Sequence, residues 1–221
     1  MTKTQIIKKT ENYVKKCMKN LPSNHDYKHV DRVRKWAIKI AQAEKKDIFL
    51  AEMAALLHDV GRAKEKPPKI LHAAIGAKMS YAFLIKNKLT SKKEAEQISY
   101  AVAHHGKGGK GWLVKILQDA DKMDAFGLIG IIRTAQYAFD LPDYDEKNIL
   151  GKTKWKKGEA TKILKTRKHV GKTIIENLNY IISWYNNLHT KSAKKLAKPF
   201  VDYLKQGRKL FIQQIKISRH V

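Results

Sequence analysis

Eight residues, Ala54–Gly61, constrain the fold of this chain more than any other stretch. They read AALLHDVG, so an apolar helical run leads into adjacent His58 and Asp59 and then into a glycine that ends the helix. Adjacent helical residues point about 100° apart, so these side chains converge only at a helix end, where other helices complete their surroundings. A histidine and a carboxylate buried among alanines and leucines need partners, and a metal ion would serve both. The alternative is a histidine that interacts with the helix dipole beside an exposed aspartate.

Helical spacing of apolar residues continues along the chain, and no window alternates in the manner of a β-strand. The sequence therefore predicts an all-α fold. We expect Ser23 or Asn24, Asp47 and Ser91 to cap three helices. The other expected helices are residues 70–88, with Ile75, Met79 and Phe83 facing inward, residues 112–139 as one long helix, and two lysine-rich helices at 161–187 and 192–218.

Length and composition exclude several classes of protein. A chain of 221 residues that is 43% hydrophobic can bury one good core. No stretch approaches the roughly 18 consecutive apolar residues of a membrane span, so no membrane partner is expected. Cys17 is the single cysteine, which excludes an intrachain disulfide and a cysteine-based zinc site. Because the first residues also lack the apolar block of a secretory signal, we expect a cytoplasmic location.

The formal net charge of +26 is extreme and unevenly distributed. Residues 151–221 hold 18 lysines and arginines against 3 acidic residues, a net charge of +15. Such a field attracts polyanions, from nucleotides to nucleic acids. The alternative for most of these lysines is a solvated surface coat of the kind found in heat-adapted proteins.

Candidate metal ligands lie on three of the expected helices. His29 falls on the inward face of its helix, His58 and Asp59 follow, and a carboxylate comes from the group near residue 120. Periodicity places Asp119 and Asp121 equally well on an inward face, so it does not choose between them. Two imidazoles and two carboxylates suit one divalent ion of Mn, Fe, Ni, Co or Zn, with Mg possible. Such an ion acidifies bound water and polarises a phosphoryl oxygen.

This ordered set resembles the H…HD…D signature of the HD-domain superfamily of metal-dependent phosphohydrolases. The resemblance extends to the neighbours of the ligands and is strongest for a group of small stand-alone hydrolases of bacteria and archaea. Lys122 stands where arginine is usual in that group. The segments that carry the resemblance are residues 29–33 (HVDRV), 57–61 (LHDVG) and 118–130 (QDADKMDAFGLIG), with a weaker match at 190–204.

The resemblance implies a phosphodiesterase-like helical bundle that forms a single domain over residues 1–221. Its core would span about residues 20–140, and a basic helical extension about residues 141–221. The family pattern gives the last ligand as the aspartate of an Ala-Asp-(Arg/Lys) triplet. The implied metal ligands are therefore His29, His58, Asp59 and Asp121.

Other residues receive roles around that metal. Asp59 or His105 would accept the proton of the attacking water. The residues expected to bind substrate phosphate are Arg62, His72, His104, His105, Lys122 and Arg133, and the three histidines among them could instead complete a second metal site. The residues expected to orient ligands are His25, Asp119 and Asp124.

The function that follows is a metal-dependent phosphohydrolase, in which a metal-activated water attacks a nucleotide or another small phosphorylated metabolite. One alternative is a nucleic-acid-binding or sensing module with a structural metal, in which the basic C-terminal third binds RNA or DNA. A further alternative is oxidative chemistry by a pair of irons, which would need the additional histidines as ligands.

Overall fold

The computed structural model describes residues 1–19, 21, 26–65, 72–153, 159–163 and 169–218. Every regular element within these ranges is a helix and none is a strand, which confirms the predicted all-α fold. The chain divides into two compact units: unit 1 comprises Met1–Asp124 and Leu188–Ala193, and unit 2 comprises Ala125–Asn187 and Lys194–Val221. A single domain over the whole chain stays a prediction. None of the described helices is long and apolar enough to cross a membrane.

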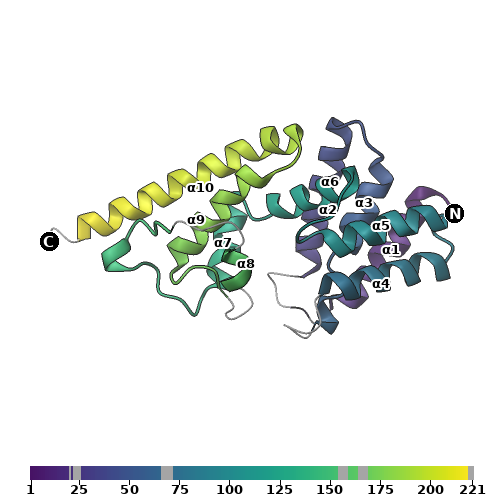
Figure 1. Cartoon of the computed structure of the whole chain (residues 1–221), viewed down its shortest axis with the longest axis horizontal. Helices are drawn as coiled ribbons and strands as arrows, with labels where there is room; N and C mark the ends of the chain where they lie inside the picture. Colours follow the sequence, from purple (N-terminus) through teal and green to yellow (C-terminus); the bar gives the residue numbers. More distant parts are fainter. Residues whose placement is uncertain (20, 22–25, 66–71, 154–158, 164–168, 219–221) are drawn as a thin grey trace. The chain divides into compact units, whose positions relative to one another are not determined.

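Unit 1 is a helical bundle built around α3 (Ile48–Leu57), which contacts α1, α2, α5 and α6 (Figure 1). Met53, Leu56 and Leu57 have no exposed surface. Since a helix that is apolar on every side is stable only when it is surrounded, the composition of α3 places it at the centre of the core. The surrounding helices are α1 (Lys3–Cys17), α2 (Tyr27–Ala43), α4 (His72–Lys86), α5 (Lys92–His104) and α6 (Trp112–Met123), and the short 3₁₀ helix η2 (Arg62–Lys64) follows α3.

Side-chain caps begin α3 and α5 at the expected residues. Asp47 accepts a hydrogen bond from the Leu50 amide, and Ser91 forms a reciprocal capping box with Glu94. The predicted cap of α2 was wrong. Asp26 caps α2 by accepting from two backbone amides of the first turn, and residues 23 and 24 lie outside the described part of the chain.

The inward face of α4 also differs from the prediction. Ile75, Met79 and Phe83 are only half-buried, and the residues one position further along the helix are buried instead. Glycine explains the rotation, because the backbone of Gly76 lies against that of Gly61, and bulkier inward residues would separate the two segments. The buried residues of α4 are Gly76, Ser80 and Leu84.

The long helix predicted over residues 112–139 is two helices. The first, α6, ends at Met123, and α7 (Gly127–Tyr137) begins at a glycine with φ of +72°. A left-handed conformation interrupts the hydrogen-bond ladder of a helix and is disfavoured for residues other than glycine. Apolar residues fall on both sides of the break, so periodicity alone did not reveal it.

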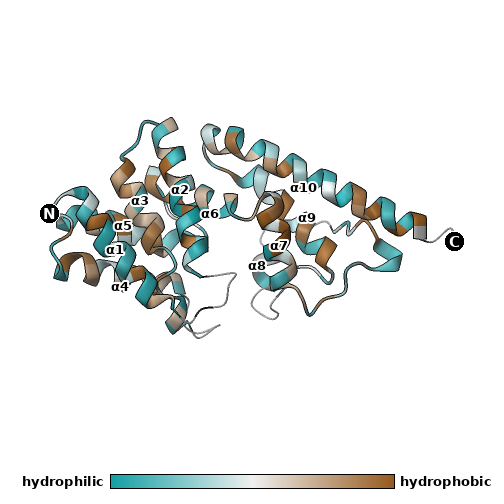
Figure 2. Ribbon diagram, turned by 180° about the vertical axis from the view of Figure 1, so that it is seen from behind, coloured by the Kyte–Doolittle hydropathy of each residue, from teal (hydrophilic) through white to brown (hydrophobic). Residues whose placement is uncertain are grey.

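Unit 2 contains α7 and the C-terminal helices (Figure 1). The predicted helix at 161–187 was also wrong, since α9 begins anew where Thr173 accepts a hydrogen bond from the Glu176 amide. The last helix, α10, begins one residue before its predicted start. The elements are η3 (Glu146–Asn148), α8 (Glu159–Ile163), α9 (Ile174–Ser183), η4 (Trp184–Asn187) and α10 (Lys191–Ser218). Figure 2 shows hydrophobic and hydrophilic residues alternating along α10, as amphipathic packing requires.

Candidate metal centre

The end of α3 positions the central pair of the site. His58 caps the C-terminus of α3, its Nδ1 donates to the carbonyl oxygen of Ala55 at 2.8 Å, and both His58 and Asp59 have no exposed surface. Because the carbonyl can only accept, Nδ1 carries the proton, and a neutral ring then presents a lone pair at Nε2. The alternative of a helix-terminal histidine beside an exposed aspartate is excluded by this burial.

A second imidazole meets His58 from α2. His29 Nδ1 donates to Asp124 Oδ2 at 2.7 Å, and Arg32 Nε holds the same carboxylate at 2.5 Å. The Nε2 atom of His29 therefore also presents a lone pair, and it lies 3.3 Å from Nε2 of His58. Two lone pairs repel each other at this distance unless a proton or a cation lies between them.

Two carboxylates complete the surroundings of these nitrogens. Asp121 Oδ1 lies 3.4 Å from His29 Nε2 and 4.0 Å from His58 Nε2. Asp59 Oδ2 lies 3.7 Å from the first nitrogen and 3.6 Å from the second. Donor atoms of His29, His58 and Asp121 lie within 4.8 Å of one another, close enough to hold one metal ion. Two imidazoles and two carboxylates fit a divalent ion with mixed nitrogen and oxygen preferences.

A neighbouring group faces the other oxygen of Asp59. Asp59 Oδ1 lies 3.5 Å from His72 Nε2 and 3.7 Å from His105 Nε2, and these nitrogens are 3.2 Å apart. Their Nδ1 atoms donate to Glu65 and to the carbonyl oxygen of Val102, so again two lone pairs face each other. This second group can also hold a metal ion. Asp59 therefore lies between two clusters of donors.

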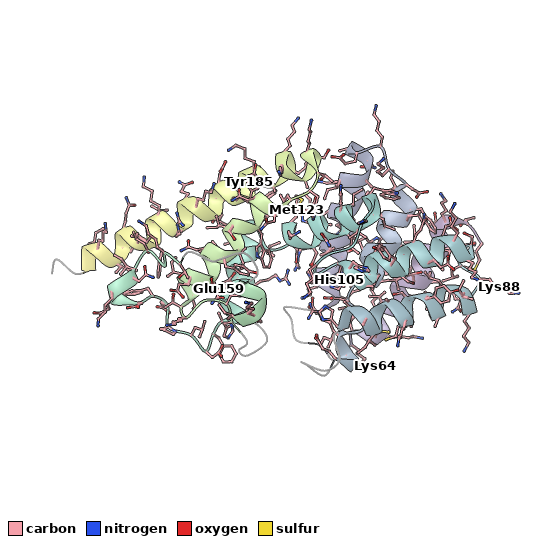
Figure 3. The ribbon with its side chains drawn as sticks, viewed as in Figure 1. Lys64, Lys88, His105, Met123, Glu159 and Tyr185 are labelled. Atoms are coloured by element: carbon pink, nitrogen blue, oxygen red, sulfur yellow. The ribbon has the colours of Figure 1, made fainter. Side chains whose placement is uncertain are left out.

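Burial sets the protonation state of His105, which Figure 3 labels at the end of α5. Its side chain is 4% exposed, and burial, reinforced by the neighbouring His58, lowers the pKa of His105 to about 4. The ring is therefore neutral near pH 7. A neutral imidazole can bind a metal or accept a proton, whereas an imidazolium can do neither.

The residues expected to bind phosphate differ in their relation to the two donor groups. Arg62 Nε donates to Asp59 Oδ2 at 2.6 Å, so this guanidinium contacts a candidate ligand directly. Lys122 is adjacent in sequence to Asp121, and burial lowers the pKa of its ammonium group. Within the described residues His104 joins neither donor group, and its Nδ1 donates to the carbonyl oxygen of Tyr100. Arg133 lies on α7 in unit 2.

The residues expected to orient metal ligands also differ in what they contact. Asp124 holds His29, as described above, whereas His25 lies outside the described residues. Asp119, which periodicity could not separate from Asp121, is turned away from the donor groups: it accepts hydrogen bonds from the backbone amides of His189 and Thr190 and from the Thr190 hydroxyl. It thereby fixes the distant segment 188–193 within unit 1.

Sequence reasoning missed several groups that shape the site. Arg32 and Glu65 hold Asp124 and His72, and neither was singled out. Gln118 anchors the glycine-rich loop after α5 by donating to the carbonyl oxygens of His104 and Gly108. Arg32 and Gln118 stood within segments that carried the family resemblance, whereas Glu65 did not.

Comparison with known families agrees with this geometry. The family model of the HD domain matches residues 26–125, a range that includes all four candidate ligands. The chain carries an HD domain. The resemblance to the HD-domain superfamily seen in the sequence is thus confirmed.

Individual relatives resemble this chain in sequence or in fold. The uncharacterized protein YpgQ of Bacillus subtilis is 28% identical over 134 residues, which cover 57% of this chain and 63% of that protein. Its crystal structure in complex with ADP covers 99% of this chain and 97% of its own, with a TM-score of 0.72 and 20% identity. An HD-superfamily hydrolase of Bacillus thuringiensis covers 97% of this chain and 99% of its own, with a TM-score of 0.70 and 26% identity. The description of that neighbour as an HD-superfamily hydrolase agrees with the family match of residues 26–125.

Proposed function

We propose that this HD protein is a metal-dependent phosphohydrolase that acts on a nucleotide or another small phosphorylated metabolite. The observation that carries the proposal is the approach of two imidazole nitrogens, His29 Nε2 and His58 Nε2, to 3.3 Å with both Nδ1 protons already donated elsewhere. Folding brings together two lone pairs and two carboxylates, Asp59 and Asp121, and a divalent cation relieves the repulsion between them.

The residues of the chain have separate roles in this proposal. His29, His58, Asp59 and Asp121 would hold a divalent ion, which would supply an acidified water and polarise a phosphoryl oxygen. Asp124 orients His29 through the Nδ1 hydrogen bond, as partners of metal-binding histidines commonly do. Asp59 and the neutral His105 are the candidate acceptors for the proton of the attacking water, since both lie at the junction of the two donor groups.

Basic side chains near the donor groups suit a phosphorylated substrate. Hydrolysis at phosphorus leaves negative charge on the departing oxygen, which cations stabilise. Lys122, next to Asp121, and Arg62, bonded to Asp59, lie near the donor groups, and His72 belongs to the second of these groups. The complex of YpgQ with ADP supports a nucleotide among the possible substrates.

The test is a phosphate-release screen over nucleoside mono-, di- and triphosphates and sugar phosphates, with Mn, Ni, Co, Zn and Mg supplied separately. We expect activity with at least one metal, and the variant His58→Ala/Asp59→Ala should lose both bound metal and activity. Asp31→Asn is the matched control, because this carboxylate lies two residues from His29 but pairs with Lys35. Activity that survives the double substitution refutes the proposal.

The metal content of the purified protein addresses the alternatives. We expect one divalent ion per chain, bound by the first donor group. Two irons per chain, together with no phosphate release from any substrate, would instead favour the oxidative alternative, in which His72 and His105 act as ligands.

A further inference from the structure

The long helix α10 presents two different faces in unit 2. Its inward face is apolar, and Ala197, Val201, Leu204 and Ile215 are buried there. The lysines of the helix lie elsewhere and are exposed (Figure 3 shows nitrogen-tipped side chains along α10). The exposed lysines of α10 in unit 2 are Lys194, Lys195, Lys198, Lys205, Lys209 and Lys216.

These six lysines form one continuous strip. At about 100° and 1.5 Å per residue, they fall within an arc of about 100° and extend over about 33 Å of the helix. We call this strip the lysine face of α10. One acidic residue, Asp202, shares the arc, and it pairs with Lys198 at 2.5 Å. The other five lysines leave the strip strongly positive along its whole length.

The composition of the lysine face distinguishes between polyanions. The large exposed apolar residues of α10 lie outside the lysine face: Tyr203, Leu210 and Ile217 recur every seven positions on a separate arc, and Phe200 lies on another. A helix that lies in a membrane surface needs apolar side chains between its flanking lysines, and the one apolar residue within the arc of the lysine face, Ile212, is half-buried. The lysine face also has no aromatic side chain on which unpaired bases could stack. A continuous cationic strip without stacking groups suits the phosphate backbone of a duplex.

We propose that the lysine face of α10 binds the phosphate backbone of double-stranded nucleic acid without reading the base sequence. Each lysine that neutralises a phosphate releases condensed counterions from the duplex, so binding weakens steeply with salt. This activity is independent of the metal centre, which lies in unit 1.

The experiment measures binding of the full-length protein to a fluorescein-labelled 20-base-pair DNA duplex by anisotropy between 50 and 200 mM salt. The test variant is Lys195→Ala/Lys205→Ala/Lys209→Ala. The matched control removes the same charge from exposed lysines of unit 1: Lys9→Ala/Lys16→Ala/Lys93→Ala. Each phosphate contact contributes about 0.9 to the slope of log K against log salt. We therefore expect the test variant to lose up to about 2.7 from this slope and at least tenfold in affinity, and the control to change little.

Several results would overturn the proposal. An equal loss of affinity in both variants would show that total charge alone attracts DNA. A second such result is no binding of the wild-type protein at 50 mM salt. A third is a preference of the wild-type protein for single-stranded oligonucleotides or for phosphatidylserine vesicles. Circular dichroism of both variants confirms retained helix content, so a loss of binding reports on charge.

Discussion

The hydrogen bond from His29 to Asp124 makes the proposed metal centre quantitatively testable. Asp124 is 2% exposed and holds His29 Nδ1 at 2.7 Å, with Arg32 on its other side. In Asp124→Asn the amide oxygen can still accept from Nδ1, but a neutral acceptor forms roughly half as strong a bond. In Asp124→Ala the ring loses this acceptor. Loss of such an orienting partner costs about 10- to 100-fold in metal affinity, which is about 1.4–2.7 kcal/mol.

We expect a graded series, with Asp124→Asn near the lower value and Asp124→Ala near the upper one. Competition with a chromophoric chelator measures the Mn or Zn affinity of each variant directly. Arg32→Gln is the comparison, because it removes a different partner of Asp124 and leaves the hydrogen bond to His29 in place. Wild-type affinity in Asp124→Ala, with the fold intact by circular dichroism, would refute the assignment of His29 as a metal ligand.

Three further predictions concern the packing and ionisation of unit 1. Gly61→Ala should lower the melting temperature, at a cost of about 1–3 kcal/mol, because the Cβ of the new alanine would lie 2.2 Å from the carbonyl oxygen of His72. Gly106→Ala is the control, because there is open space around Gly106, and it should leave the melting temperature unchanged. Equal melting temperatures for the two variants would contradict the close approach at Gly61. Leu57→Ala should cost about 2–5 kcal/mol in urea unfolding; a cost below 1 kcal/mol would argue against its burial. Burial raises the pKa of the Cys17 thiol and outweighs the hydrogen bond from Tyr13. The rate of iodoacetamide alkylation should therefore rise with pH at a higher midpoint than in the urea-unfolded chain. A midpoint at or below that of the unfolded chain would contradict the burial of the thiol.

Much of unit 1 was predictable because local chemistry decided it. The caps at Asp47 and Ser91 need only a side-chain oxygen and an amide three residues away. The run of apolar residues before His58 similarly leaves α3 no stable position except the core. His29, His58, Asp59 and Asp121 followed from a pattern that joins separate helices, and the match of the HD domain covers all four.

The errors arose where contacts over long distances in sequence decided the structure. Periodicity offered Asp119 and Asp121 equally, and what separates them in the structure is a pair of amides about 70 residues away, at His189 and Thr190. The rotation of α4 likewise depends on a backbone contact between Gly61 and Gly76. The break before α7 depends on the left-handed conformation of Gly127, which a glycine permits but does not require.

The hydrogen bonds to Asp119 limit which fragments of this protein can fold on their own. A fragment trimmed to the matched range, residues 26–125, would lack both α1 and the donors of segment 188–193. The Asp119 carboxylate has no exposed surface, so the fragment would have to hydrate or protonate a group that three donors now satisfy. A recombinant piece with those limits should aggregate or stay partly unfolded, because unit 1 requires both Met1–Asp124 and Leu188–Ala193, which are separated in sequence by Ala125–Asn187 of unit 2.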